Sequence, residues 1–236
     1  MMIEPTSALE NSGMAGETSS EPGSERLPRY DQPSYRFLKR TADIFLSAFA
    51  LIILFPVFFI ISMVIIKGDG GPIFFKQRRL GQNGQTFWIY KFRSMRKDAE
   101  KVLAEILAKD PEARKEFETT YKLKNDPRII PGGKFLRSSS LDELPQLLNV
   151  LKGEMSLVGP RPIVEKELSM FGDRTEMYLR MKPGCAGLWQ CSGRNDVSYD
   201  ERIALNEEYY YTAGFRKDFS IMWRTFVSII RGGGAY

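Results

Sequence analysis

The feature that most constrains this chain is an uncharged apolar segment of 23 residues, Ile44–Ile66 (IFLSAFALIILFPVFFIISMVII). A run of this length and composition is typical of a membrane helix, since about 20 apolar residues cross the hydrocarbon core of a bilayer. Basic residues stand on both sides of it: Arg36, Lys39 and Arg40 before, and Lys67, Lys76, Arg78 and Arg79 after. Because positive charge favours the cytoplasmic side of a membrane, this pattern favours keeping both ends of the segment there.

Pro56 lies near the middle of the segment, where a proline removes one helical hydrogen bond and clashes with the preceding turn. A break there leaves two halves of about 12 residues, each roughly 18 Å long at about 1.5 Å per residue. Neither half spans a hydrocarbon core of about 30 Å. We therefore expect a re-entrant helix–break–helix over residues 36–69, which enters one leaflet and returns. The alternative is one spanning helix kinked at the proline, which membranes tolerate.

Residues 1–35 differ from the rest of the chain in composition and charge. They are rich in Glu, Ser, Gly, Thr and Pro and have no apolar period, which predicts a disordered tail. Six acidic and two basic residues give this tail a charge of −4, so the remainder carries +9 within a total of +5. A basic body indicates a polyanionic partner, which is nucleic acid, acidic lipid headgroups or a phosphorylated substrate.

The chain contains no histidine and two cysteines, Cys185 and Cys191. The lack of His excludes a nucleophile activated by His, and two Cys supply neither a disulfide framework nor a zinc site, so we expect two free thiols. The P-loop pattern GxxxxGK[ST] is absent, which disfavours a kinase or a nucleotide triphosphatase. Chemistry must therefore come from carboxylates, Lys, Arg, hydroxyl groups and a hard metal ion.

From Gly70 onward the pattern predicts a folded domain, residues 70–236, of α/β or mainly α class. A β-hairpin is expected from Pro72–Gln77 and Gln85–Phe92 around a turn at 81–84, and helices are expected at about 98–109, 111–122 and 141–151. The last predicted helix carries an apolar stripe, flanked by basic residues, at Phe219, Met222, Trp223, Phe226, Val227 and Ile230. This stripe fits an interfacial amphipathic helix and a core-facing helix equally well.

Two adjacent carboxylates, Asp142 and Glu143, follow Ser140 at the start of a predicted helix. Ser140 and Glu143 have the spacing of a capping box, so the pair has a plain structural interpretation. Pro145 makes this helix start irregular if Ser140 is the N-cap. A carboxylate held ionised at a helix N-terminus beside basic residues is also suited to attack phosphorus or to bind magnesium. The pattern alone leaves both interpretations open.

Basic residues recur in short clusters that suit phosphate binding: Arg78 and Arg79, Lys91 and Arg93, Arg137, Arg161 between two prolines, and Arg194. The guanidinium fork of Arg matches two phosphate oxygens, and Lys supplies a point charge. A solvated basic surface is the simpler explanation for any single one of them. The neighbouring Gly184, Gly187 and Gly193 either permit close approach of a ligand or form turns.

Four stretches resemble the bacterial sugar transferase family, the monotopic polyprenyl-phosphate phosphoglycosyl transferases: KFRSM at 91–95, LRSSSLDELPQLLNVLKGEMSLVGPRP at 136–162, KPGCAGLWQCSGRND at 182–196 and the terminal GAY. The resemblance covers about residues 36–236 and is strongest to the undecaprenyl-phosphate galactose phosphotransferases of exopolysaccharide synthesis. Two departures stand out. Phe55-Pro56 replaces the Ser-Pro that the family often has at its helix break, and PGCAGLWQCSGR replaces PGITGLWQVSGR.

The resemblance implies ping-pong transfer of a hexose-1-phosphate, galactose-1-phosphate first and glucose-1-phosphate next, from a UDP-sugar to undecaprenyl phosphate with release of UMP. By this match Asp142 is the nucleophile, and Asp142 and Glu143 bind Mg²⁺. Arg137 and Arg161 match family positions linked to phosphate binding, and the expected substrate-binding set adds Arg79, Lys91, Arg93 and Arg194. Residues 70–236 are then a catalytic domain on the cytoplasmic face of the bacterial inner membrane. Membrane lipids are further partners, and a homodimer is left open.

Two other functions are consistent with parts of the sequence. A membrane-anchored nucleic-acid binder would explain the basic body and the 12% aromatic content, but helix-turn-helix, zinc-finger and RRM signatures are absent, so we expect no nucleic acid partner. A non-catalytic scaffold of a polysaccharide assembly complex would use residues 142–143 only as a helix cap. The presence of both acids together with the flanking arginines favours the enzyme.

Overall fold

The computed structural model describes residues 27–120, 123–192 and 197–230, and this part of the protein is mainly helical. Of the two expected fold classes, α/β or mainly α, the second is confirmed. The helices of four or more residues are α1 (Pro33–Asp69), α2 (Ala99–Lys109), α3 (Pro111–Thr120), α4 (Gly133–Ser138), α5 (Gln146–Lys152), η4 (Glu165–Arg174), α6 (Thr175–Arg180), α7 (Tyr199–Thr212) and α8 (Phe215–Ile230). Strands β1 (Phe74–Leu80) and β2 (Thr86–Phe92) form one small sheet, and β3 (Ser156–Val158) and β4 (Gly184–Ala186) form another.

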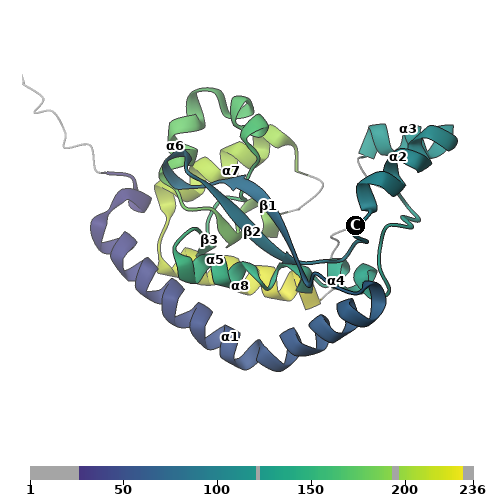
Figure 1. Ribbon diagram of the computed structural model, residues 1–236. Helices are drawn as coiled ribbons and strands as arrows, with labels where there is room; N and C mark the ends of the chain where they lie inside the picture. Colours follow the sequence, from purple (N-terminus) through teal and green to yellow (C-terminus); the bar gives the residue numbers. More distant parts are fainter. Residues whose placement is uncertain (1–26, 121–122, 193–196, 231–236) are drawn as a thin grey trace, which may run out of the picture.

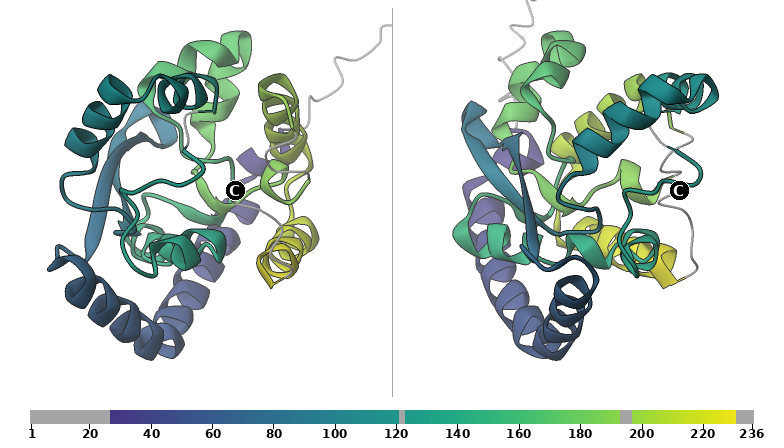
Figure 2. Two further views of the ribbon diagram at one scale, coloured as in Figure 1. Left: turned by 90° about the vertical axis from the view of Figure 1, so that its right-hand side faces the viewer. Right: turned by 45° about the vertical axis from the view of Figure 1, so that its right-hand side comes forward.

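Helix α1 is one bent helix of 37 residues that contains Pro56. It bends at its lowest point in Figure 1, and both of its ends rise toward the rest of the protein (Figures 1 and 2). The expected break is therefore a bend within a continuous helix, as occurs when a proline removes one hydrogen bond and the flanking turns keep theirs. Among the described helices it is the one long and apolar enough to cross a membrane, and only 11% of its most apolar 18-residue window is buried. This exposed apolar surface indicates membrane association.

Polar side chains fasten the N-terminal arm of α1 to the rest of the protein. Arg40 donates to the carbonyl groups of Val150 and Leu151 in the last turn of α5, at 2.5 and 2.8 Å. Asp43 accepts a hydrogen bond of 3.0 Å from the backbone N–H of Leu157 in β3. Lys39 and Asp218 of α8 form a buried ion pair of 2.8 Å. The position of this arm is therefore fixed by α5, β3 and α8 together.

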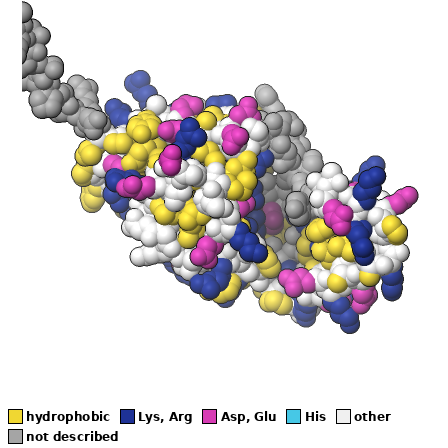
Figure 3. Space-filling model, turned by 90° about the horizontal axis from the view of Figure 1, so that it is seen from above, with side chains coloured by type: hydrophobic (Ala, Val, Ile, Leu, Met, Phe, Trp, Pro, Cys, Tyr) yellow, Lys and Arg dark blue, Asp and Glu magenta, His cyan; other side chains and the backbone are white. Residues whose placement is uncertain are grey.

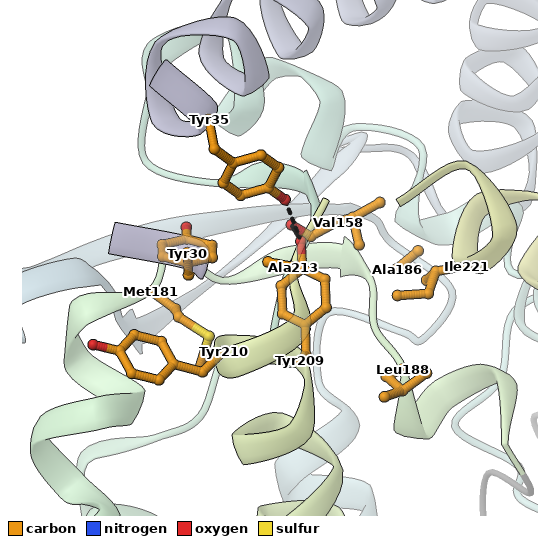
Figure 4. Packing of buried hydrophobic residues seen from close by; sticks show 10 residues of the cluster. All are labelled: Tyr30, Tyr35, Val158, Met181, Ala186, Leu188, Tyr209, Tyr210, Ala213 and Ile221. Atoms are coloured by element: carbon orange, nitrogen blue, oxygen red, sulfur yellow. Dashed lines mark hydrogen bonds between the residues drawn. The ribbon is translucent and has the colours of Figure 1, made fainter. Parts of the chain in front are cut away.

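An aromatic core joins the start of the described chain to α7 and α8 (Figure 4). Tyr30, Tyr35 and Tyr209 are buried, and the hydroxyls of Tyr35 and Tyr209 both donate to Asp218, at 2.8 and 2.7 Å. This corrects part of the expected tail. Residues 1–26 lie outside the described part, but residues 27–35 hold the 3-10 turn Arg29–Asp31 and the start of α1. Two tyrosines bury enough apolar surface to order this polar stretch.

The predicted hairpin is confirmed, with a first strand that ends three residues later than expected. β1 pairs antiparallel with β2, and Phe74 lies opposite Phe92. The turn between them holds Asn83 and Gly84 at positive φ, of 56° and 75°, a conformation that Gly and Asn adopt most readily. The hairpin crosses in front of α5 and α8 in Figure 1.

Helix α8 turns its apolar stripe outward. Phe219, Trp223 and Phe226 are 66%, 58% and 54% exposed, whereas Ile221 and Asp218 on the other side of the helix are buried. Met222 of the same stripe packs against the core, so the stripe is divided between an exposed aromatic part and a part that faces the core. Helices α1 and α8 thus both carry exposed apolar side chains.

Helices α2 and α3 form an arm that stands apart from the main body in Figure 1 and appears as a separate lobe in Figure 3. Asp110 caps the start of α3, since its Oδ1 accepts hydrogen bonds from the backbone N–H groups of Glu112 and Ala113, at 2.9 and 3.1 Å. The described part of α3 ends at Thr120, and residues 121–122 of the predicted helix lie outside the described residues.

Candidate active site

Asp142 and Glu143 lie in a single 3-10 turn, Leu141–Glu143, between α4 and α5. Ser140 precedes this turn at a φ of 56° and makes no side-chain capping hydrogen bond. The expected capping box and the continuous helix over 141–151 are therefore wrong, because α5 begins only at Gln146. Pro145 is the physical reason, since it has no N–H to donate to a helix that would start before it.

The side chain of Glu143 is held by β2 instead of capping a helix. Lys91 Nζ donates to Glu143 Oε1 at 2.6 Å, and the side chain of Gln146 hydrogen-bonds the same carboxylate. Burial raises the pKa of Glu143, but Lys91, Arg161 and Gln146 together outweigh burial and hold this pKa below its ordinary value. Glu143 is therefore ionised at neutral pH.

Asp142 has the opposite electrostatic character. Burial raises its pKa to about 6, and the charge of Glu143 adds to the rise, while Lys91 and Arg137 oppose it. Two adjacent carboxylates thus have pKa values on either side of the ordinary range, a divergence that is typical of catalytic pairs with separate roles. Asp142 is the member whose protonation changes closest to neutral pH.

A small polar pocket adjoins the carboxylate pair through Glu143. Its lining residues are Arg79, Ile89, Lys91, Glu143, Gln146, Arg161, Pro162, Gly184, Cys185 and Gln190. Three of the expected phosphate-binding residues, Arg79, Lys91 and Arg161, therefore meet in one place. Burial, and then the charge of Arg161, lowers the pKa of Arg79. Like charges this close are stabilised when an anion binds between them.

Close packing of backbone shapes one wall of this pocket. A Cβ atom on Gly159 or on Gly184 would lie within 2.3 Å of a backbone atom of the neighbouring strand or turn. Glycine is required here so that β3 and β4 can approach each other. This role of Gly184 is neither of the two expected ones, close approach of a ligand or a turn. The approach brings Arg161 and Cys185 to the same pocket. Both cysteines are free, as expected, and burial raises the pKa of Cys185, so it is a neutral thiol.

The other expected phosphate-binding residues lie at different places. Arg137 is in the last turn of α4, near enough for its charge to lower the pKa of Asp142. Arg93 is 6% exposed and forms an ion pair of 2.9 Å with Asp69, so it joins the end of β2 to the end of α1. Arg194 lies in 193–196, outside the described residues.

Asn149 is a site residue that the sequence did not reveal. It is fully buried, and its side-chain amide accepts from Tyr90 N at 3.1 Å and donates to Trp88 O at 2.7 Å. The amide therefore pairs with the edge of β2 that β1 leaves open, as a neighbouring strand would. Because Lys91 follows Tyr90 and Glu143 precedes α5, this contact sets where Lys91 and Glu143 meet. The two amide side chains within the leucine-rich sequence of α5, Gln146 and Asn149, were the available signal, since buried polar groups require partners.

The carboxylate pair fits a magnesium ion that is shared with a substrate. Among the described residues, no cluster of three or more His, Cys, Asp or Glu side chains is present. Mg²⁺ usually takes one or two protein carboxylates and completes its shell with waters and substrate phosphates. Asp142 and Glu143 supply those two carboxylates, so they would hold the ion only together with a phosphorylated ligand.

Comparison with known proteins gives a consistent result. A relative in Salmonella typhimurium, undecaprenyl-phosphate galactose phosphotransferase, is 50% identical over 203 residues, which are 86% of this chain and 42% of that protein. Exopolysaccharide production protein ExoY of Sinorhizobium fredii is 46% identical over 198 residues, which are 84% of this chain and 88% of ExoY. UDP-glucose:undecaprenyl-phosphate glucose-1-phosphate transferase of Escherichia coli is 35% identical over 191 residues, which are 78% of this chain and 38% of that protein.

The chain thus spans less than half the length of the Salmonella and Escherichia relatives and most of the length of ExoY. The sequence model of the bacterial sugar transferase family matches residues 34–232, which include α1 and the carboxylate pair. This chain therefore belongs to the bacterial sugar transferase family.

Proposed function

We propose that this protein transfers a hexose-1-phosphate from a UDP-sugar to undecaprenyl phosphate and releases UMP, as the first membrane step of exopolysaccharide or capsule synthesis. The observation that carries the proposal is the carboxylate pair with divergent pKa values beside a pocket lined by Arg79, Lys91 and Arg161. The names of the Salmonella, Sinorhizobium and Escherichia relatives support the substrates and the pathway.

Two displacements at phosphorus account for the reaction. Ionised Asp142 attacks the β-phosphorus of the UDP-sugar, the bond from this phosphorus to the bridging oxygen breaks, and UMP leaves with that oxygen. An oxygen of undecaprenyl phosphate then attacks the same phosphorus, and the Asp142 carboxylate leaves. The three basic residues offset the charge of the diphosphate. Mg²⁺, held by Asp142 and Glu143, would supply further positive charge when bound.

The decisive experiment is a transfer assay with protein in nanodiscs that contain undecaprenyl phosphate. Wild-type protein should convert UDP-galactose to UMP and a lipid-linked galactose phosphate, and Asp142→Asn should form neither product. Asp173→Asn, the same change at an exposed carboxylate, is the matched control and should retain activity. Lack of turnover by wild-type protein with every UDP-sugar tested would favour the non-catalytic scaffold.

Galactose-1-phosphate is the proposed cargo, with glucose-1-phosphate the second candidate. The relative named for galactose is 50% identical to this chain, against 35% for the relative named for glucose. Competition between labelled UDP-galactose and UDP-glucose in the same assay tests this choice. A higher kcat/KM for UDP-glucose would reverse the order.

We propose that both ends of α1 lie on the cytoplasmic side of the inner membrane. The basic residues on both flanks, the bend, and the rise of both ends toward the folded domain support this arrangement (Figure 2). The test places a single cysteine by Ser34→Cys or Lys109→Cys in protein whose own cysteines are replaced. An impermeant thiol reagent outside intact inner membranes should label neither. Labelling of Ser34→Cys alone would show that α1 spans the bilayer.

A further inference from the structure

A second cavity, of about 260 Å³, lies between the N-terminal arm of α1, strand β3 and α8. Its lining residues are Lys39, Ala42, Asp43, Leu46, Leu157, Val158, Phe215, Asp218, Phe219 and Met222, and none of them lines the polar pocket at Glu143. Val158 also belongs to the aromatic core drawn in Figure 4, so the inner wall of the cavity is part of the folded core.

The charged side chains in the cavity wall already have partners. Lys39 pairs with Asp218 at 2.8 Å, and Asp218 also accepts hydrogen bonds from two buried tyrosine hydroxyls. Asp43 accepts the backbone N–H of Leu157 at 3.0 Å. An ordered water needs about two to four polar partners, and apolar cavities of about 150 Å³ stay dry and accept apolar ligands. The cavity is therefore suited to a hydrocarbon ligand.

The rim of the cavity is continuous with the apolar outer surface of α1 and α8. Leu46, Phe215 and Phe219 line the cavity and are 47%, 48% and 66% exposed. Leu46 has exposed apolar neighbours along α1, including Phe45 and Phe49 at 70% and 63% exposure. A continuous apolar surface of this extent marks a membrane contact. The cavity therefore opens toward lipid.

Two exposed arginines are close in sequence to residues that line the cavity. Arg36 precedes Lys39 by one turn of α1, and Arg216 directly follows Phe215. The rings of Tyr35 and Phe215 are in contact, with centroids 5.7 Å apart, so Arg36 and Arg216 extend from neighbouring backbone positions. Guanidinium groups bind phosphate through two hydrogen bonds. The cationic residues are at the end of the N-terminal arm of α1, and the apolar lining extends toward the bend of α1. This order matches that of the headgroup and the acyl chain in a phospholipid.

We propose that this cavity binds one acyl chain of an anionic phospholipid whose phosphate lies at Arg36 and Arg216. The occupant is a bilayer phospholipid and not the polyprenyl carrier, because the cavity lies against the N-terminal arm of α1. The carboxylate pair lies at the other arm, where Leu141 and Leu144 pack with Ile61. The proposal rests on the insertion of α1 into lipid and is independent of the transfer reaction.

Photolabelling in nanodiscs tests the site. The full chain is reconstituted in phosphatidylethanolamine and phosphatidylglycerol, with a trace of phosphatidylglycerol that carries a diazirine at the end of one acyl chain. After irradiation, peptide mapping should find label on Leu157 and Met222 as well as on exposed Ile52. Ala42→Phe fills the cavity and should lower label at Leu157 and Met222 at least fivefold, with Ile52 unchanged.

Ala48→Phe is the matched control, since it makes the same substitution on the same helix outside the cavity lining and should change nothing. Leu157→Phe fills the cavity from β3 and should reproduce the loss of photolabel at Met222. This second variant keeps the test valid if Ala42→Phe displaces α1. The double substitution Arg36→Gln and Arg216→Gln should reduce label from phosphatidylglycerol more than label from a phosphatidylcholine probe.

Three results would overturn the proposal. The first is photolabel of wild-type protein that is found only on exposed residues such as Ile52. If both Ala42→Phe and Leu157→Phe leave the label at Met222 unchanged, the labelled acyl chain does not reach Met222 through this cavity. Label at Leu157 from a diazirine polyprenyl phosphate, and none from phosphatidylglycerol, would assign the cavity to the carrier. A protein that labels as expected but lacks transferase activity would keep this proposal and reject only the proposed function.

Discussion

The raised pKa of Asp142 predicts an acid limb in the first half-reaction. In the proposed reaction the attacking species is the carboxylate, so activity should be present above this pKa and lost as the pH falls through it. With a pKa of about 6, Asp142 is about 90% ionised at pH 7 and about 10% ionised at pH 5. At limiting Mg²⁺, where the metal does not lower this pKa, the rate of UMP release should therefore fall about ninefold between pH 7 and pH 5. An aspartate at its ordinary pKa of about 3.9 would lose less than about 10%.

The assay is single-turnover release of UMP from UDP-galactose in the absence of undecaprenyl phosphate. Omitting the lipid matters, because a phosphate monoester itself titrates near pH 6. Lys91 lowers the pKa of Asp142, so Lys91→Met should move the acid limb to higher pH. Lys101→Met, the same change on the exposed surface of α2, should leave the limb in place.

Two outcomes would refute this reasoning. A rate that stays constant from pH 7 to pH 5 in wild-type protein would show that Asp142 is not the titrating nucleophile. A limb at the same pH in Lys91→Met and in wild-type protein would show that Lys91 does not act on Asp142.

Asp142→Asn should raise the free energy of unfolding at pH 7 by on the order of 2 kcal/mol in urea titrations, because a carboxylate whose folded-state pKa is raised is costly to ionise. This gain should shrink as the pH falls below about 6 and vanish below about pH 4, where both states are protonated. Excess chelator should stop UMP release and added Mg²⁺ should restore it, whereas full activity in chelator would show that the basic residues suffice. Asn149→Leu should lower the free energy of unfolding by about 2 kcal/mol or more, because Trp88 O and Tyr90 N lose buried partners; urea titration measures the change. Glu143→Gln should reduce kcat strongly in the nanodisc assay, and turnover near the wild-type rate would contradict the role of the pair.

Local signals in the sequence predicted the elements that depend on local contacts. The hairpin follows from alternating residues around a glycine turn, and α3 begins at a cap that Asp110 makes with its own backbone neighbours. The structure of residues 140–145 was predicted wrongly because two local signals conflicted. Capping-box spacing favoured a helix from Ser140, and Pro145 prevented it. The start of α1 was also missed, because Tyr30 is ordered by contacts with α7, far along the chain.

The residues of the candidate site could be predicted from the sequence, but the contacts that bring them together could not. Asp142, Glu143, Lys91 and Arg161 were identified from their chemistry and from the family resemblance. Their meeting depends on the approach of β3 to β4 and on the bond from Asn149 to β2, which join segments about 60 residues apart or fewer. Arg93 illustrates the limit, because its type and its neighbours resemble those of Lys91 but its partner is Asp69. Sequence gives the type of a residue, whereas tertiary contacts decide its partner.

The packing of Ile61 and Ile65 against Leu141 and Leu144 would make the rate of the proposed reaction depend on the thickness of the bilayer. The two leucines flank Asp142, so the depth at which α1 rests sets the height of this carboxylate above the lipid phosphates. A thinner or thicker leaflet that lifts or lowers the bent helix carries Asp142 with it by the same amount. In the proposed function, the composition of the bilayer would therefore control turnover through vertical alignment, with no bilayer phospholipid in contact with the reacting groups.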